Sequence, residues 1–200
     1  MFSDFATHQE FVDQVFEGLG LTEQEVNSKR FYDCRFVDCV FNETLFRKCR
    51  FRGCTFERCD LQLVRFPDTS FSDTQFEQSS LAGVNWTEAQ WPRKGFLCPI
   101  GFIECRISHS TFIGLSLKEI VIRDCVARNV DFRETNLTRA DLRGTDFEES
   151  LFIHTDLTEA DFTGAKNYTI NASVNRLEGA KFALPEAMAL LYGLDIVLIE

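Results

Sequence analysis

The sequence predicts a solenoid assembled from five-residue repeats. Large apolar residues occupy every fifth position from 11 to 91 without interruption, and phenylalanine accounts for 21 of the 200 residues. A second series with the same spacing, two residues before each large one, holds small side chains from Cys34 to Ala89. An α-helix repeats every 3.6 residues and a β-strand every two, so a period of five fits neither. A period sustained over this length indicates a repeat architecture.

The same spacing resumes after residue 91 in a phase shifted by one. Large residues then recur from Phe102 to Phe162, and Leu177 and Phe182 fall in the same phase. We call each large residue the central residue of its repeat. In the second half, the residue just before the centre is acidic or Asn in Asp131, Asn136, Asp141, Asp146, Asp156 and Asp161. The segments ADLRG (140–144) and ADFTG (160–164) combine all of these features.

This pattern resembles that of the pentapeptide-repeat family, whose unit is A(D/N)LXX, over about residues 29–182. The resemblance implies an all-β fold, the right-handed quadrilateral parallel β-helix, in which four pentapeptides form one square coil. The central and small residues of each repeat then point inward. Residues 20 apart stack on neighbouring coils about 4.8 Å apart. Phenylalanine ladders are therefore expected in the first half, and a leucine ladder through Leu117, Leu137, Leu157 and Leu177 in the second.

Three segments are expected along the chain. Residues 1–28 form an N-terminal cap and a first irregular coil, because the small positions are lost at Gln14, Leu19 and Gln24 and a solenoid end needs a polar cap. Residues 29–182 form the β-helix, interrupted near 87–101. Residues 183–200 form a short C-terminal helix and strand that serve as a dimerisation segment.

The interruption lies in the sequence WTEAQWPRKGFLCPIG at 86–101. It holds both tryptophans, two of the four prolines and a basic pair, and proline cannot donate to a ladder of hydrogen bonds. The phase shift requires at least one extra residue here. Two interpretations stay open: a loop that joins two half-solenoids, and a projection that binds a partner through Trp91, Arg93 and Lys94.

The C-terminal sequence LPEAMALLYGLDIVLIE predicts a helix that begins near Pro185 and ends near Gly193. The residues after it form a strand that is apolar on both faces, and such a strand needs a cover. The tail resembles that of the pentapeptide proteins that protect type II topoisomerases, in which a helix and a strand form a two-fold dimer. The resemblance implies a homodimer interface made by Leu184, Met188, Leu191, Ile196, Val197 and Leu198.

Composition and motifs argue against several classes of function. The net charge of −10 disfavours direct nucleic-acid or membrane binding through a basic face. No run of 18 apolar residues and no secretory signal are evident, so a cytoplasmic location is expected. Seven of the eight cysteines take the small inward position and are expected to be reduced, buried and free of metal. No catalytic motif occurs, so neither enzyme activity nor a cofactor is expected.

The topoisomerase-poison resistance group offers the nearest functional resemblance. It comprises the Qnr quinolone-resistance, albicidin-resistance and microcin B17 immunity proteins, and GVNWTEAQWP (83–92) is similar to the albicidin-resistance member. The resemblance implies a DNA-mimicking protein that binds DNA gyrase or topoisomerase IV and protects it from drugs or toxins. The alternative is a structural or adaptor protein that binds another protein partner.

Charge patterning locates the candidate partner-binding surface. Residues 131–166 carry nine acidic and four basic residues, whereas residues 30–60 carry five acidic and seven basic ones. An acidic rod suits a partner with a basic DNA saddle. The residues expected to bind such a partner, since none is a central or small residue, are Asp141, Glu148, Glu149 and Glu159.

Overall fold

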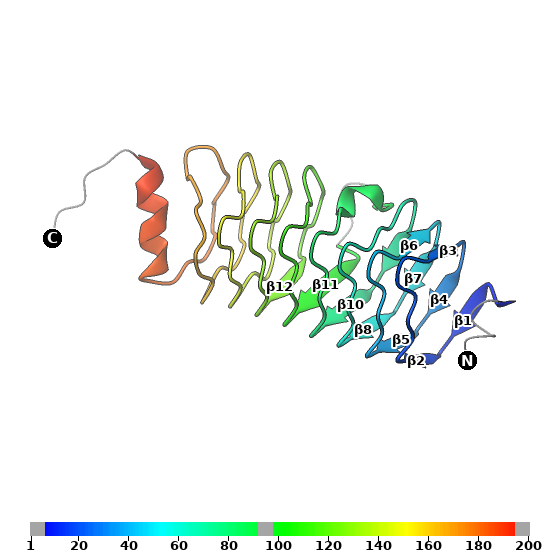
Figure 1. Cartoon of the computed structure of the whole chain (residues 1–200). Coiled ribbons are helices and arrows are strands. Elements are labelled where there is room, and N and C mark those ends of the chain that lie inside the picture. The colour runs from blue at the N-terminus through cyan, green and yellow to red at the C-terminus, as the bar shows by residue number, and fades with distance from the viewer. Residues whose placement is uncertain (1–6, 92–97, 195–200) are drawn as a thin grey trace.

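The computed structural model describes residues 7–91 and 98–194, which wind coil upon coil into a rod (Figure 1). Its strands are three or four residues long, and two 3₁₀ helices accompany them, η1 (Trp86–Glu88) and η2 (Glu186–Leu194). The strands are β1 (Glu10–Val12), β2 (Val15–Glu17), β3 (Glu25–Asn27), β4 (Arg30–Tyr32), β5 (Arg35–Val37), β6 (Leu45–Arg47), β7 (Arg50–Arg52), β8 (Thr55–Glu57), β9 (Ser70–Ser72), β10 (Thr74–Glu77), β11 (Ile100–Ile103) and β12 (Val121–Arg123).

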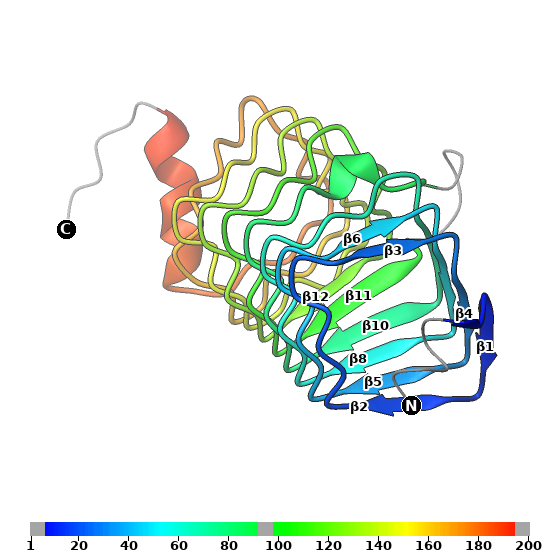
Figure 2. The same cartoon turned by 45° about the vertical axis from the view of Figure 1, so that its right-hand side comes forward.

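The faces of the rod are parallel sheets whose strands come from successive coils. One face stacks β1, β4, β7 and β9, the next stacks β2, β5, β8, β10, β11 and β12, and a third pairs β3 with β6 (Figure 2). Phe36 pairs with Phe56, and Phe56 pairs with Phe76, so the coil repeats every 20 residues. The quadrilateral parallel β-helix expected from the sequence is confirmed.

Stacked phenylalanine rings fill the N-terminal half of the interior. The rings of Phe36 and Phe56 lie 4.5 Å apart, centroid to centroid, and 9° from parallel. Neighbouring ladders meet edge to face, as where Phe36 approaches Phe51 at 6.1 Å and 71°. Both arrangements are favourable for aromatic pairs. One coil rises about 4.8 Å, which is close to the distance between stacked rings. The same spacing therefore suits both the backbone hydrogen bonds and the ring stacking.

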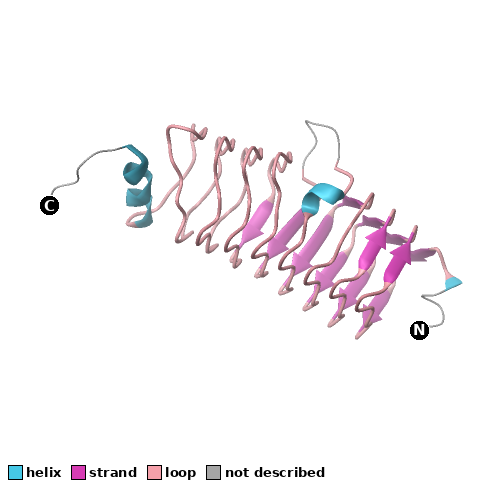
Figure 3. Ribbon diagram, turned by 45° about the horizontal axis from the view of Figure 1, so that its top comes forward, coloured by secondary structure: helices cyan, strands magenta, loops and turns pink. Residues whose placement is uncertain are grey.

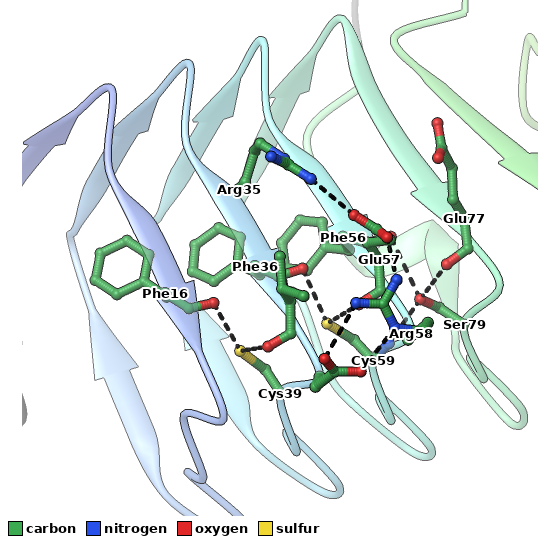
Figure 4. Close-up of polar contacts among 12 residues, drawn as sticks. Phe16, Arg35, Phe36, Cys39, Phe56, Glu57, Arg58, Cys59, Glu77 and Ser79 are labelled. Carbon is green, nitrogen blue, oxygen red and sulfur yellow. Dashed lines mark hydrogen bonds and ion pairs between the residues drawn. The ribbon is translucent and has the colours of Figure 1, made fainter.

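The small inward residues do more than fill space, because many donate hydrogen bonds to the preceding coil. The Cys39 thiol donates to the carbonyl of Phe16 at 3.4 Å, and the Cys59 thiol donates to that of Phe36 at 3.3 Å (Figure 4). Thr69 makes the equivalent bond to Phe46 at 2.7 Å. The sequence interpretation of these cysteines as small apolar fillers is therefore incomplete. A side chain that is small and also carries a donor satisfies a carbonyl inside the rod.

The sides of the coils differ between the two halves, whereas the corners keep the same backbone conformation. Described strands end at Arg123, and the later coils are built from turns and single bridges (Figure 3). In these turns the third residue donates back to the centre, as Ala140 does to Leu137 at 3.0 Å. The second residue after the centre takes a left-handed conformation, with φ of 58° at Glu134 and 68° at Gly144. The sides of the rod are thus formed by short strands in the N-terminal half and by turns and single bridges towards the C-terminal end.

The first coil follows the register of the second. Phe11 pairs with Phe31, while Gln14 is exposed at the end of the rod. Lys29 occupies a small inward position and is buried, and its ammonium donates to the carbonyl of His8 at 2.6 Å. Burial lowers the pKa of Lys29. Residues of the predicted N-terminal cap region therefore include a regular coil, closed in part by this lysine.

The interruption inserts six residues between two coils that stay in register. Phe76 pairs with Phe102, 26 residues away, where the regular separation is 20. Gln90 still bridges Ser70 at the regular distance in sequence, so the additional residues enter after it. The sequence required at least one extra residue at this place, and the register shows six.

The C-terminal helix η2 lies across the end of the last coil (Figure 1). Ala189 and Leu190 pack against the core cluster. The helix therefore covers apolar side chains at the end of the rod, where the coils stop. The strand predicted to follow it lies outside the described residues.

The core supports a graded stability prediction. Phe56 is fully buried between two ladder neighbours, so Phe56→Ala is expected to lower the free energy of unfolding by about 3–5 kcal/mol. Cys59→Ala removes a smaller volume and one weak hydrogen bond and should cost about 1 kcal/mol. Urea unfolding followed by circular dichroism measures both, with the exposed Gln14→Ala as control. A Cys59→Ala loss as large as that of Phe56→Ala would contradict the ladder as the main source of stability.

Candidate partner-binding surface

The carboxylates that precede the central residues cap the turns. Asp131 and Asp161 accept a hydrogen bond from the backbone N–H two residues later, at 3.0 and 2.9 Å. Asn136 makes the same bond through its amide oxygen at 2.9 Å. This is the local bond by which Asp and Asn stabilise turns, and it accounts for the alternation of the two residues at this position. These side chains belong to the scaffold of the rod.

Asp141 is one of these turn residues. The other three predicted partner-binding carboxylates do not precede a central residue. Its side chain is 23% exposed and accepts two 2.7 Å hydrogen bonds from the Arg143 guanidinium, with Arg123 at 3.8 Å. The backbone N–H of Arg143 adds a third bond at 3.3 Å. The hydrogen bonds from Arg143 lower the pKa of Asp141 against the opposing effect of burial. Asp141 is therefore charged but already engaged.

Glu148, Glu149 and Glu159 project from the rod. The side chains of Glu148 and Glu159 are 49% and 61% exposed, and each meets an arginine, Arg128 at 2.9 Å and Arg139 at 3.7 Å. Glu149 is exposed and forms no ion pair with any residue in 7–91 or 98–194. Exposed pairs of this kind are weak, so all three carboxylates remain open to a partner.

The exposed carboxylates do not gather on one face. Glu149 and Glu159 are ten residues apart, which is half of a 20-residue coil, so they occupy opposite sides of the rod. Glu148 stays beside Glu149. A flat partner can reach only one of these sides, whereas a partner that wraps around the rod can reach both.

A basic groove lies in the other half of the molecule and was not singled out from the sequence. It holds about 510 Å³ and crosses one corner of the rod. Its lining consists of Ser28, Arg30, Lys48, Cys49, Arg50, Asp68, Ser70 and Gln90. The net positive charge of residues 30–60 was its only signal in the sequence. That count does not tell which cations are free, because pairing joins residues from different coils.

The tryptophans of the interruption are anchored inward. Trp86 is fully buried and stacks between Phe66 and Phe112, with centroids 5.5 and 5.8 Å away. Trp91 packs against the core and donates from Nε1 to the carbonyl of Trp86 at 2.8 Å. Its indole N–H is thus already satisfied within the chain. Arg93 and Lys94, predicted with Trp91 to bind a partner, lie outside the described residues.

The predicted dimer surface is described only in its first part. Leu184 is 77% exposed and Met188 40% exposed, while Leu191 is half-buried. Leu184 and Met188 are thus exposed apolar members of the predicted surface at the end of the rod. Ile196, Val197 and Leu198 lie outside the described residues.

The cysteines of the described residues differ in their electrostatic setting, and a hydrogen bond with Cys54 lowers the pKa of the buried Cys34 thiol to about 7. All eight are free thiols, and seven are buried. Burial raises the pKa of Cys49 to about 11 and that of Cys98 to about 12, which keeps both protonated at neutral pH. Within 7–91 and 98–194, no group of three or more His, Cys, Asp or Glu is placed to hold a metal ion. In the same residues, no helix has the length and apolar character needed to cross a membrane.

Comparison with known proteins gives matches in family and in fold. A model described as a pentapeptide repeat region matches residues 29–97, and one described as pentapeptide repeats (8 copies) matches residues 131–166, together just over half of the chain. A trypsin-treated form of QnrB1, a plasmid-mediated fluoroquinolone resistance protein, matches with a TM-score of 0.64 at 17% identity, over 95% of this chain and 97% of that one. Full-length QnrB1 matches with a TM-score of 0.53 at 17% identity, over 94% and 100%. No curated protein sequence matches the chain.

The two roles of the carboxylates can be separated by substitution. Asp141→Ala removes the turn bond and is expected to cost on the order of 1 kcal/mol of unfolding free energy. Asp141→Asn keeps an oxygen for the backbone N–H, as Asn136 does naturally, and should cost less, and Glu149→Ala should cost almost nothing. Urea unfolding at pH 7 measures all three.

The same variants predict a pH dependence. Because the folded-state pKa of Asp141 is lowered, its charge stabilises the rod above the unfolded pKa of about 3.9 and ceases to do so as the pH falls through the folded value. The stability difference between the wild type and Asp141→Asn should therefore shrink as the pH falls from about 5 to about 2. A difference that grows over this range would contradict the assignment.

Proposed function

The chain belongs to the pentapeptide-repeat family. From this premise we propose that it mimics DNA and binds a type II topoisomerase, with DNA gyrase as the leading candidate. In binding, it protects the enzyme from drugs or toxins. The observation that carries the proposal is the set of exposed carboxylates on opposite sides of a rod. The resistance function in the name of QnrB1, a protein of the same fold, supports it.

The charge distribution favours a partner that grips the rod. Residues 131–166 have a net charge of −5, and the turn carboxylates among them are held by arginines and backbone N–H groups. Glu148, Glu149 and Glu159 supply the charge that a partner can meet. A DNA-binding saddle is concave and basic, as it must accept phosphates on both sides of a duplex, so it suits carboxylates half a coil apart.

A homodimer through the C-terminal end forms part of the proposal. Leu184 exposes apolar surface just before the helix that closes the rod, and Met188 exposes it on that helix. A second copy would cover both. The residues predicted to complete this interface, Ile196, Val197 and Leu198, belong to the same proposal. Two copies joined in this way place their acidic segments close to a shared centre and lengthen the acidic rod.

The six-residue insertion favours a second candidate, an adaptor that binds another protein through the segment following Trp91. Trp91, the last described residue before this segment, is itself held by its hydrogen bond to the carbonyl of Trp86. In both cases we propose a binding role without a cofactor rather than a catalytic one. We place the protein in the cytoplasm, where it would encounter a topoisomerase.

Supercoiling by gyrase in the presence of a fluoroquinolone tests the leading proposal. The wild type is expected to restore supercoiling, and the triple variant Glu148→Lys, Glu149→Lys, Glu159→Lys is expected to lose this effect. The matched control reverses the same number of exposed charges in the other half, Glu17→Lys, Glu23→Lys and Glu43→Lys, and should retain most of the activity. Binding should also weaken as salt is raised. Full protection by the triple variant would eliminate DNA mimicry and leave the adaptor.

Sedimentation tests the dimer. The wild type is expected to sediment as a dimer at micromolar concentration, and Leu184→Asp combined with Met188→Asp should give monomers, because two charges would be desolvated in the interface. Leu63→Asp alters an apolar residue whose 54% exposure lies between those of Leu184 and Met188, far from the C-terminal end, and should leave the dimer intact. A monomeric wild type would refute this part of the proposal.

A further inference from the structure

We propose that the basic groove binds a short acidic segment of a partner protein in extended conformation. The groove is the one lined by Arg30, Lys48 and Arg50 with Ser28, Ser70 and Gln90. It lies on the coils of the N-terminal half, away from Glu148, Glu149 and Glu159. The inference therefore concerns a second contact and does not rest on the topoisomerase proposal.

Of the three cations that line this groove, Arg30 is paired with Glu10, whereas Lys48 and Arg50 differ from their neighbours in lacking a carboxylate partner among the described residues. Elsewhere in the same coils arginines are bonded to carboxylates: Arg35 meets Glu57 at 2.9 Å, Arg47 meets Glu25 at 3.2 Å and Arg58 meets Asp38 at 2.8 Å. Lys48, Arg50 and Arg52 have no carboxylate of residues 7–91 or 98–194 within 4 Å. Lys48 and Arg50 line the groove, and Arg52 lies two residues beyond Arg50 on β7. Three such cations in a chain with net charge −10 favour an external anion.

The spacing of these cations matches the spacing of alternate side chains on an extended peptide. Arg50 and Arg52 flank the buried Phe51 on β7, and both are exposed on the outer face. Residues two apart on a strand repeat at about 6.6 Å, which is also the spacing of alternate side chains on an extended ligand. Arg30 lies directly beside Arg50 on β4, one coil away, and can hold the same ligand from its other edge. Guanidinium groups bind carboxylates in bidentate pairs.

The borders of the groove limit the length of the anion. Asp68 lines the groove one coil beyond Lys48, and Glu10, already paired with Arg30 at 2.9 Å, stands towards the N-terminal side. A polyanion such as a nucleic acid would run from the three free cations onto these carboxylates and the acidic surface beyond. A segment with two or three carboxylates at alternate positions matches the patch, so an acidic protein segment is favoured over nucleic acid.

The test uses a fluorescein-labelled peptide, Gly-Ser-Glu-Ser-Glu-Ser-Glu-Ser-Gly, and the full-length protein. Fluorescence anisotropy at about 0.1 M salt should show saturable binding to the wild type. Lys48→Gln, Arg50→Gln and Arg52→Gln together should weaken it about tenfold or more. The matched control removes three positive charges that are already paired, Arg35→Gln, Arg47→Gln and Arg58→Gln, and should change the affinity by less than about threefold. Circular dichroism verifies that both variants fold.

Two further ligands separate the outcomes. A peptide of equal charge with its three glutamates adjacent should bind more weakly, since its carboxylates do not match alternate arginines. A four-nucleotide oligothymidylate should also bind more weakly than the alternating peptide. Tighter binding of the oligonucleotide, equal losses in the two triple variants, or no binding of the peptide to the wild type would each overturn the proposal. Protection of gyrase by the Lys48, Arg50, Arg52 variant should be unchanged, so failure here and failure of the proposed function are distinguishable.

Discussion

Stacking of each central side chain on the one a coil away is the constraint on which the rest of the molecule depends. The rings of the first ladders lie 4.5 to 5.5 Å apart, close to the spacing that parallel hydrogen bonding imposes on adjacent coils. The narrow interior then admits one large and one small side chain per pentapeptide. Thr69 and Cys59 show that the small side chain also satisfies a carbonyl of the preceding coil. The central and small inward residues thus fill the interior, and the small ones also satisfy its backbone carbonyls.

The outer surface follows from this interior. Three residues of each pentapeptide face outward, and in the second half the one before the centre is used to cap the turn, as Asp131 and Asp161 do. The remaining two carry the charges that a partner can meet. Many are neutralised between coils, because residues 20 apart stand side by side, and Arg139 reaches Glu119 and Glu159 on its two sides in this way. What distinguishes one part of the rod from another is therefore the set of charges left unpaired.

The solenoid tolerates a large insertion because its coils contact only their neighbours. Phe76 and Phe102 stack at 5.4 Å and 16° across the six additional residues, as closely as ladder members without an insertion. Closing a loop of this size costs little entropy. An insertion after Gln90 can therefore present new side chains to a partner while the core continues unchanged on either side.

The sequence by itself determined the repeat, the two inward columns, the ladders and the C-terminal helix, because a side chain that must fit a narrow interior leaves a periodic trace. It could not determine the size of the insertion, since a shift of one and a shift of six have the same phase in a five-residue period. Nor could it separate the engaged Asp141 from the open Glu149, or the paired Arg47 from the free Arg50. Those distinctions arise from contacts between coils and from individual side-chain orientations. Only the tertiary structure decided them, because outward positions accept many residue types and leave no periodic trace.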